Sequence, residues 1–134
     1  MPLVGNTTSG ALTRTRIADY IAAKESVTVV AVTDAARVAT SAELVVSKLF
    51  TQTPTAARTF TTPTAAVLIA YLTDEVVGSS FEFTIVNLAA TTHAITVTAD
   101  TGVTIVGVAA VSAATSGTFI GVVTSTSAVS IYRK

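Results

Sequence analysis

His93 is the only histidine of the chain, and histidine is the side chain that most often acts as a general base in enzymes. A nucleophilic serine or threonine needs such a base within hydrogen-bond reach. The chain is rich in hydroxyl residues, yet no serine lies in the G-x-S-x-G pattern of a nucleophile elbow. We therefore interpret His93, at the start of an expected strand, as a structural or surface residue.

The carboxylates do not form a pattern that serves acid–base chemistry. Asp74 and Glu75 are sequence neighbours, so they point in different directions, and Glu82 and Asp100 belong to separate elements. We expect Glu82 on an outer strand face and Asp100 in a turn. With no cysteine and no cluster of histidine and carboxylate, the sequence predicts neither a metal site nor any other cofactor.

Aromatic side chains are the remaining residues that could form a ligand-binding site. Tyr71, Phe81, Phe83 and Phe119 could form a wall on which a ligand stacks, but aromatic residues at strand spacing more often fill a core. We expect these four to hold the fold together. A small hydrolase is therefore the least favoured class of function.

The chain has unusually few charges. Charged residues make up 12% of the sequence, whereas about 25% is ordinary for soluble domains. Between Val76 and Tyr132 the only formal charges are Glu82 and Asp100, and threonine and serine are abundant instead. Such a surface is solvated by hydroxyl groups or buried against other chains, and self-association is our hypothesis.

Charge and hydropathy also argue against two kinds of partner. The net charge is zero, and Arg14 and Arg16 are the only close basic pair before the final two residues, so we expect no nucleic-acid binding. The longest clear apolar run, Ala65–Leu72, is far shorter than the ~18 to 20 residues that span a bilayer. The first residues lack the pattern of a signal peptide, and we expect no membrane partner.

The amino-terminal half mixes several short elements. Residues 1–16 lack hydrophobic periodicity and are expected to form an extended arm, followed by a short helix at Ile17–Lys24. Val27–Val32 and Arg58–Thr61 are predicted strands. The range 34–48 fits a helix, or a segment that ends in a strand at 44–50, and its period does not decide between them.

One helix has clear boundary signals. Thr62 is a suitable N-cap and Pro63 suits the first helical position, so we expect a helix over Pro63–Leu72. Because this helix is apolar on every side, we expect it to be sandwiched between other elements.

The carboxy-terminal half alternates with period two. Phe81, Phe83 and Ile85 share one face of a predicted strand, and a second strand over Ala94–Ala99 turns Ile95 and Val97 inward. The short segment between them predicts an antiparallel hairpin. Further strands are expected at 103–106, 117–124 and 128–132.

These elements predict a mainly β fold. We expect an antiparallel β-sandwich or a jelly-roll-like fold with one or two short helices, organised as an amino-terminal arm (1–16) and a single β-rich domain (17–134). Its edge strands carry few of the charges that normally protect sheet edges, so a symmetric assembly is expected to cover them.

Part of the chain resembles a known group of virion proteins. The segments "TPTAARTFTTPTAAVLIAYL", "VGSSFEFTIVN", "HAITVTADTGVTIVG", "GTFIGVV" and "AVSIYR" resemble a β-rich module of tailed bacteriophages, especially head decoration or cement proteins of cyanobacterial phages. The resemblance covers about residues 53–133. Related modules also look like parts of phage tail fibres, and residues 1–52 match no motif.

The resemblance implies a β-sandwich or jelly-roll-like subunit that forms homotrimers on the outer capsid surface of a virion and is made in the host cytoplasm. It implies no enzyme activity and no cofactor, and its expected partner is the major capsid protein. Arg14 and Arg16 are the candidate contacts to acidic residues of that partner. The alternative function is a receptor-binding or tail-fibre module that binds host glycans.

Overall fold

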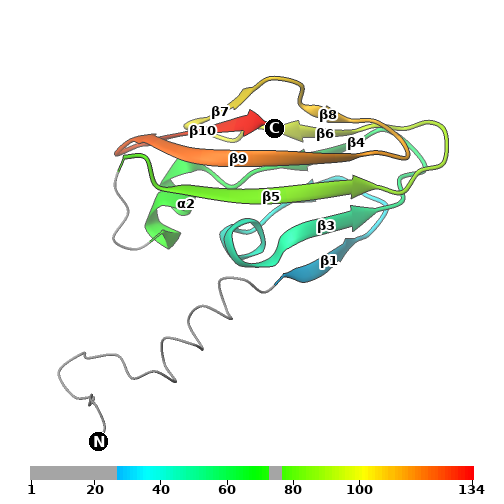
Figure 1. Ribbon diagram of the computed structural model, residues 1–134, viewed down its shortest axis with the longest axis horizontal. Coiled ribbons are helices and arrows are strands. Elements are labelled where there is room, and N and C mark those ends of the chain that lie inside the picture. Colours follow the sequence, from blue (N-terminus) through cyan, green and yellow to red (C-terminus); the bar gives the residue numbers. More distant parts are fainter. Residues whose placement is uncertain (1–26, 73–76) are drawn as a thin grey trace, which may run out of the picture.

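The chain folds into two β-sheets packed face to face, as a computed structural model of residues 27–72 and 77–134 shows (Figure 1). The larger sheet has six strands in the order β1-β3-β5-β9-β10-β7, and the smaller sheet has four in the order β2-β4-β6-β8. The predicted mainly β, sandwich-like fold is confirmed. The strands of the larger sheet are β1 (Thr28–Val32), β3 (Lys48–Gln52), β5 (Ser80–Asn87), β7 (Val103–Val106), β9 (Ser116–Ser125) and β10 (Ala128–Arg133). Those of the smaller sheet are β2 (Arg37–Val38), β4 (Arg58–Thr61), β6 (Ile95–Thr98) and β8 (Ala110–Val111).

The first six strands wind back and forth between the two sheets. Strands β1, β3 and β5 pair in parallel in the larger sheet, while β2, β4 and β6 pair in parallel in the smaller one. Each parallel pair needs a crossover, and here the crossover runs through the opposite sheet. Antiparallel pairing appears where β9 lies between β5 and β10 and where β8 lies beside β6. The sheets are therefore mixed, whereas we expected antiparallel ones.

The expected hairpin between the strands at 81–85 and 94–99 is wrong. Strand β5 belongs to the larger sheet and β6 to the smaller one, so the chain crosses the sandwich between them. Both strands turn their alternate apolar residues to the same core, as the alternation predicted. Alternation identifies the buried face of a strand but not the strand beside it, so a hairpin and a crossover give the same pattern.

Four phenylalanines form the centre of the core. The rings of Phe50 and Phe60 meet edge to face with centroids 4.8 Å apart, and those of Phe83 and Phe119 stack at 5.3 Å. All four are buried, and Phe81 packs beside them. The core interpretation is thus correct for the three phenylalanines we named, but Tyr71 lies on the surface with 43% exposure.

The undecided range 34–48 contains strand β2 and the short π-helix η3 (Glu43–Ser47), and β3 follows at once. A capping box starts this helical turn. The backbone N–H of Glu43 donates to Oγ1 of Thr40, and the Glu43 carboxylate accepts from the backbone N–H of Thr40. Leu44 of η3 is fully buried and closes one end of the core.

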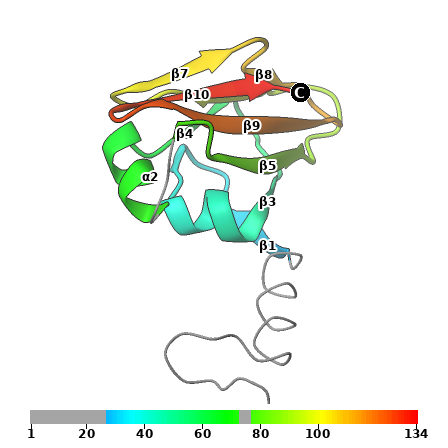
Figure 2. The ribbon, with the colours of Figure 1, turned by 60° about the vertical axis from the view of Figure 1, so that its left-hand side comes forward.

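Helix α2 (Ala65–Tyr71) starts later than predicted. Its N-cap is Thr64, whose Oγ1 accepts from the backbone N–H of Val67. Thr62 is instead buried and accepts from the backbone N–H of Asp100 at 3.3 Å. The helix is not sandwiched, because it lies at the end of the sandwich where β5 begins, and Val67 stays 53% exposed (Figure 2).

Several sequence predictions lie outside the described residues. These are the arm at 1–16 with Arg14 and Arg16, the helix at 17–24 and the acidic pair Asp74-Glu75. The other strand predictions are confirmed to within one or two residues at each end, and Val103–Val106 and Arg58–Thr61 match their predicted bounds.

Candidate functional site

His93 lies in the crossover between β5 and β6, away from any nucleophile pattern. Its φ angle of 78° puts it in the left-handed region, and its side chain is exposed. The backbone carbonyl of His93 accepts a hydrogen bond of 2.9 Å from Nδ2 of Asn87. The backbone of His93 therefore helps to shape a turn.

Asn87 is the residue that holds this crossover, and our sequence analysis missed it. Its side chain is buried, its Nδ2 donates to the carbonyls of His93 and Val111, and its Oδ1 accepts from the backbone N–H of Ala89 at 3.0 Å. A buried carboxamide is stable when its polar atoms are paired in this way. The signal was available, because the alternation of β5 places Asn87 on the inward face after Ile85.

The acidic residues that we singled out lie apart from each other. Glu82 lies on the outer side of β5, where its carboxylate is 3.1 Å from Nζ of Lys134. Asp100 lies in the turn before β7 and accepts from the backbone N–H of Thr101 at 2.6 Å. Both positions agree with the expected outer face and turn. In the described part of the chain, no group of three or more histidine, aspartate or glutamate side chains could hold a metal ion.

An ion pair between Asp34 and Arg58 joins the loops at the end of the sandwich where β1 and β3 end. Asp34 accepts from Nε of Arg58 at 2.7 Å and from both the hydroxyl and the backbone N–H of Thr55. The Arg58 guanidinium, followed by the Thr55 donors, holds the pKa of Asp34 well below its ordinary value, and the same pair raises the pKa of Arg58. Because its partners come from two segments of the chain, the Asp34 carboxylate ties the loop before β2 to the loop before β4.

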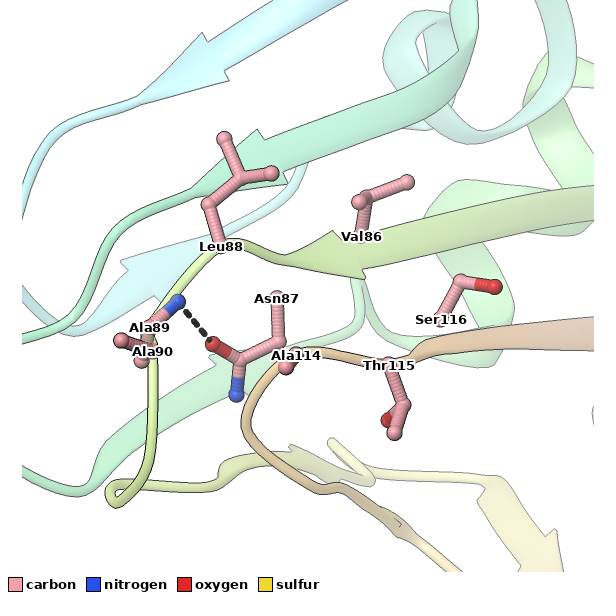
Figure 3. Close-up of a pocket in the computed structure, with 8 residues that line it drawn as sticks. All are labelled: Val86, Asn87, Leu88, Ala89, Ala90, Ala114, Thr115 and Ser116. Atoms are coloured by element: carbon pink, nitrogen blue, oxygen red, sulfur yellow. Dashed lines mark hydrogen bonds between the residues drawn. The ribbon is translucent and has the colours of Figure 1, made fainter.

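A hollow lies where β5 ends and β9 begins (Figure 3). It has a volume of about 490 Å³ and is lined mainly by small and apolar side chains. The Asn87 carboxamide is bonded within the protein, and the Thr115 hydroxyl donates to the carbonyl of Ser112 at 2.7 Å. Specific small-molecule sites need a few polar groups that converge on the ligand, and this hollow offers few.

The outer side of the larger sheet carries almost no charge. We use the name outer face for the side chains that alternate with the buried ones on the six strands of the larger sheet. They are Val29, Ala31, Leu49, Thr51, Ser80, Glu82, Thr84, Val86, Thr104, Val106, Ser116, Thr118, Ile120, Val122, Thr124, Ala128, Ser130 and Tyr132. Glu82 is the only charged residue among them, and it is paired with Lys134. The hydroxyls of Thr84 and Thr118 bond to each other at 2.9 Å across β5 and β9.

No other element of the described residues covers this outer face. Both helices lie at the end of the sandwich where β3 and β5 begin, and in the described ranges no helix lies over the sheet (Figures 1 and 2). The other charged residues of the described part of the chain are not among these positions. Arg37 and Arg58 lie on the smaller sheet and Asp34 in a loop beside it, Glu43 begins η3, Asp100 lies in a turn, and Lys48, Arg133 and Lys134 lie at the ends of β3 and β10. The fold thus brings mostly uncharged strand positions that are distant in sequence onto one face of the larger sheet.

The smaller sheet has a narrower outer surface with the same chemistry. Thr59 and Thr61 on β4 lie beside Thr96 and Thr98 on β6, and the hydroxyls of Thr61 and Thr98 are 2.8 Å apart. This surface gives a matched reference for experiments on the outer face.

Among the described residues, no helix is both long and apolar enough to cross a membrane. A scan against protein-family models, a search of curated proteins and a search of solved structures each found no match to the chain.

Proposed function

We propose that the protein is a structural virion protein: a head decoration (cement) protein that binds the outer capsid surface of a phage head as an oligomer and stabilises the shell without enzyme activity. The observation that carries the proposal is the outer face of the larger sheet, which is broad, open and almost free of charge. The sequence resemblance to phage decoration modules gives the proposal its partner, the major capsid protein.

The composition of the outer face suits adhesion to a protein surface. Charged residues are depleted at the centres of protein interfaces, and apolar and aromatic residues are enriched. Here valine, leucine, isoleucine and tyrosine alternate with threonine and serine that can bond to a partner's backbone. An ionic partner such as a nucleic acid would find no cluster of positive charge on this face.

The size of the outer face argues that several copies act together. Six strands about 4.8 Å apart and about 20 Å long span roughly 500 Å², whereas a stable interface buries about 800 Å² per partner. One copy would therefore bind weakly. An oligomer that places several outer faces on one shell gains affinity through effective concentration. An arm that carries Arg14 and Arg16 would add further contacts.

Co-sedimentation with phage heads assembled without this protein tests the proposal. We expect saturable binding and greater resistance of the heads to heat. Thr118→Lys, at the centre of the outer face, should weaken binding at least tenfold, because it places an ammonium group in the contact. Thr98→Lys is the matched control, since Thr98 is also half-buried and bonded to a threonine on the next strand, but in the smaller sheet.

Two results would contradict the proposal. Equal binding by the two lysine variants would exclude the outer face as the contact. Binding to host cells, with none to heads, would favour the alternative of a receptor-binding or tail-fibre module.

A further inference from the structure

The two margins of the larger sheet are uncharged strands. Strand β1 (Thr28–Val32) pairs only with β3, and β7 (Val103–Val106) only with β10, within the ranges that the structure describes. An edge strand presents backbone N–H and C=O groups that can pair with another chain, and proteins usually protect such edges with charges, proline or very short strands. Neither β1 nor β7 contains a charge or a proline.

The margins of the smaller sheet are protected in this way. Strands β2 and β8 have two residues each. Beside β8, Nη1 of Arg133 donates to the carbonyls of Val108 and Ala110 at 3.2 and 2.9 Å, and so covers the free side of that strand. Beside β2, Arg37 forms an ion pair with Glu43. The contrast singles out the larger sheet as the one whose margins are open to pairing.

The two open margins are compatible with each other. Strand β1 is parallel to β3 and β5, β9 reverses the direction, β10 reverses it again, and β7 is parallel to β10. Strands β1 and β7 therefore run in the same direction, and they have five and four residues. In Figure 1 they lie at opposite margins of the molecule. A rotation can therefore relate two copies so that β1 of one copy lies beside β7 of the other.

The core is also half open at both margins. Val30 on β1 and Ile105 on β7 pack against the core but are only partly buried. Next to them, Val29 is 56% exposed and Val106 is 41% exposed. Apolar residues at these four positions gain burial if the two margins meet.

We propose that β1 of one copy pairs in parallel with β7 of a second copy of this chain, head to tail. The register that keeps the core sides of both strands together and also pairs all four residues of β7 sets Val29 beside Thr104, Val30 beside Ile105 and Ala31 beside Val106. The larger sheets of successive copies then form one continuous sheet, with all outer faces on the same side. A head-to-tail contact of this kind closes into a ring or extends as a chain, according to the rotation. The pairing itself does not depend on binding to a phage head.

Charge substitutions at the margins test this pairing in solution. Light scattering should give a mass of more than one chain for the wild-type protein at about 100 µM. Val29→Lys should raise the dissociation constant at least tenfold. Val38→Lys, which changes a similarly exposed valine on β2, should not. Val29→Lys with Thr104→Glu in the same chain should restore the assembly, because the lysine of one copy then faces the glutamate of the next. Circular dichroism confirms that each variant is folded.

Cysteine cross-linking tests the direction and the register, because the chain contains no cysteine of its own. A mixture of Ala31→Cys and Val106→Cys proteins should form the mixed disulfide on mild oxidation, with little disulfide between identical variants. A disulfide mainly between two Ala31→Cys chains would show a two-fold β1–β1 contact and overturn the proposal. A monomeric wild-type protein, or no restoration in the double variant, would overturn it as well.

Discussion

Replacing Gly121 with alanine tests the packing between the two central strands of the larger sheet. Gly121 lies opposite Phe81 in the β5–β9 pair, on the side that faces the core. A Cβ atom at Gly121 would lie 2.2 Å from Cζ of Phe81 and 2.5 and 2.7 Å from its two Cε atoms. The ring fills the space above the glycine, so the alanine forces Phe81 to move.

The expected loss is moderate. Overpacking of a core costs about 1 to 3 kcal/mol, and replacing glycine in a strand returns about 0.5 to 1 kcal/mol of backbone entropy. The free energy of unfolding should therefore fall by about 1 to 2 kcal/mol. For a chain of this length that corresponds to a decrease in Tm of roughly 4 to 7 °C.

Urea unfolding followed by far-ultraviolet circular dichroism measures this loss, since the chain has no tryptophan. The decisive comparison is the same substitution in a Phe81→Ala background. Without the ring there is no collision, so Gly121→Ala should then be neutral or stabilising, even though Phe81→Ala alone costs about 3 to 5 kcal/mol. An equal cost in both backgrounds, within about 0.5 kcal/mol, would refute the contact between the two residues.

Two further substitutions test the groups that hold the crossovers. Asn87→Ala removes three hydrogen bonds, two of them buried and one part-buried, so the free energy of unfolding should fall by about 3 kcal/mol in the same urea assay. A loss below about 1 kcal/mol would contradict that role. Asp34→Asn tests the pair with Arg58. Because folding lowers the pKa of Asp34 below its ordinary 3.8, its contribution is fully present above about pH 5 and declines as the pH falls through the acid range. The stability difference between wild type and Asp34→Asn should thus shrink between pH 6 and pH 2.5, and a constant difference would contradict the prediction.

The sequence predicted which strand faces are buried better than which strands are neighbours. Alternation placed Phe83 and Ile95 inward without any knowledge of the fold, because the side-chain period of a strand is local. The partner of a strand depends on the crossover instead. Asn87 is the local sign of that crossover, since a carboxamide on the inward face needs backbone partners that a simple hairpin does not supply.

Short strands and helix ends could not be predicted from the sequence, for a different reason. Strands β2 and β8 have two residues each, and no period can be recognised in two residues. Thr62 and Thr64 are equally good N-caps by type, and the backbone N–H of Asp100, which bonds the hydroxyl of Thr62, decides between them. A tertiary contact therefore determines which threonine caps the helix.

The shortage of charge predicted an interaction surface but could not locate it. The sequence put Glu82 on an outer strand face and Asp100 in a turn, but only the strand order shows which sheet carries Glu82 and which uncharged strands surround it. In the same strand order, Asp34, Arg37 and Arg58 lie on the smaller sheet and its loops. A surface formed by six strands from across the chain becomes visible once their register is known.

The winding of the chain explains why this surface is open. Parallel strands usually follow one another through helices that cover the faces of the sheet. Here the connections between parallel strands pass through the opposite sheet, and helix α2 and η3 lie at one end of the sandwich. The inner faces are buried against each other, and nothing within residues 27–72 and 77–134 covers the outer face of the larger sheet. A sheet that is open on one face and at both margins can pair with copies of itself at the margins and still present its outer face to a larger surface, and the uncharged composition of β1, β7 and the outer face suits both contacts.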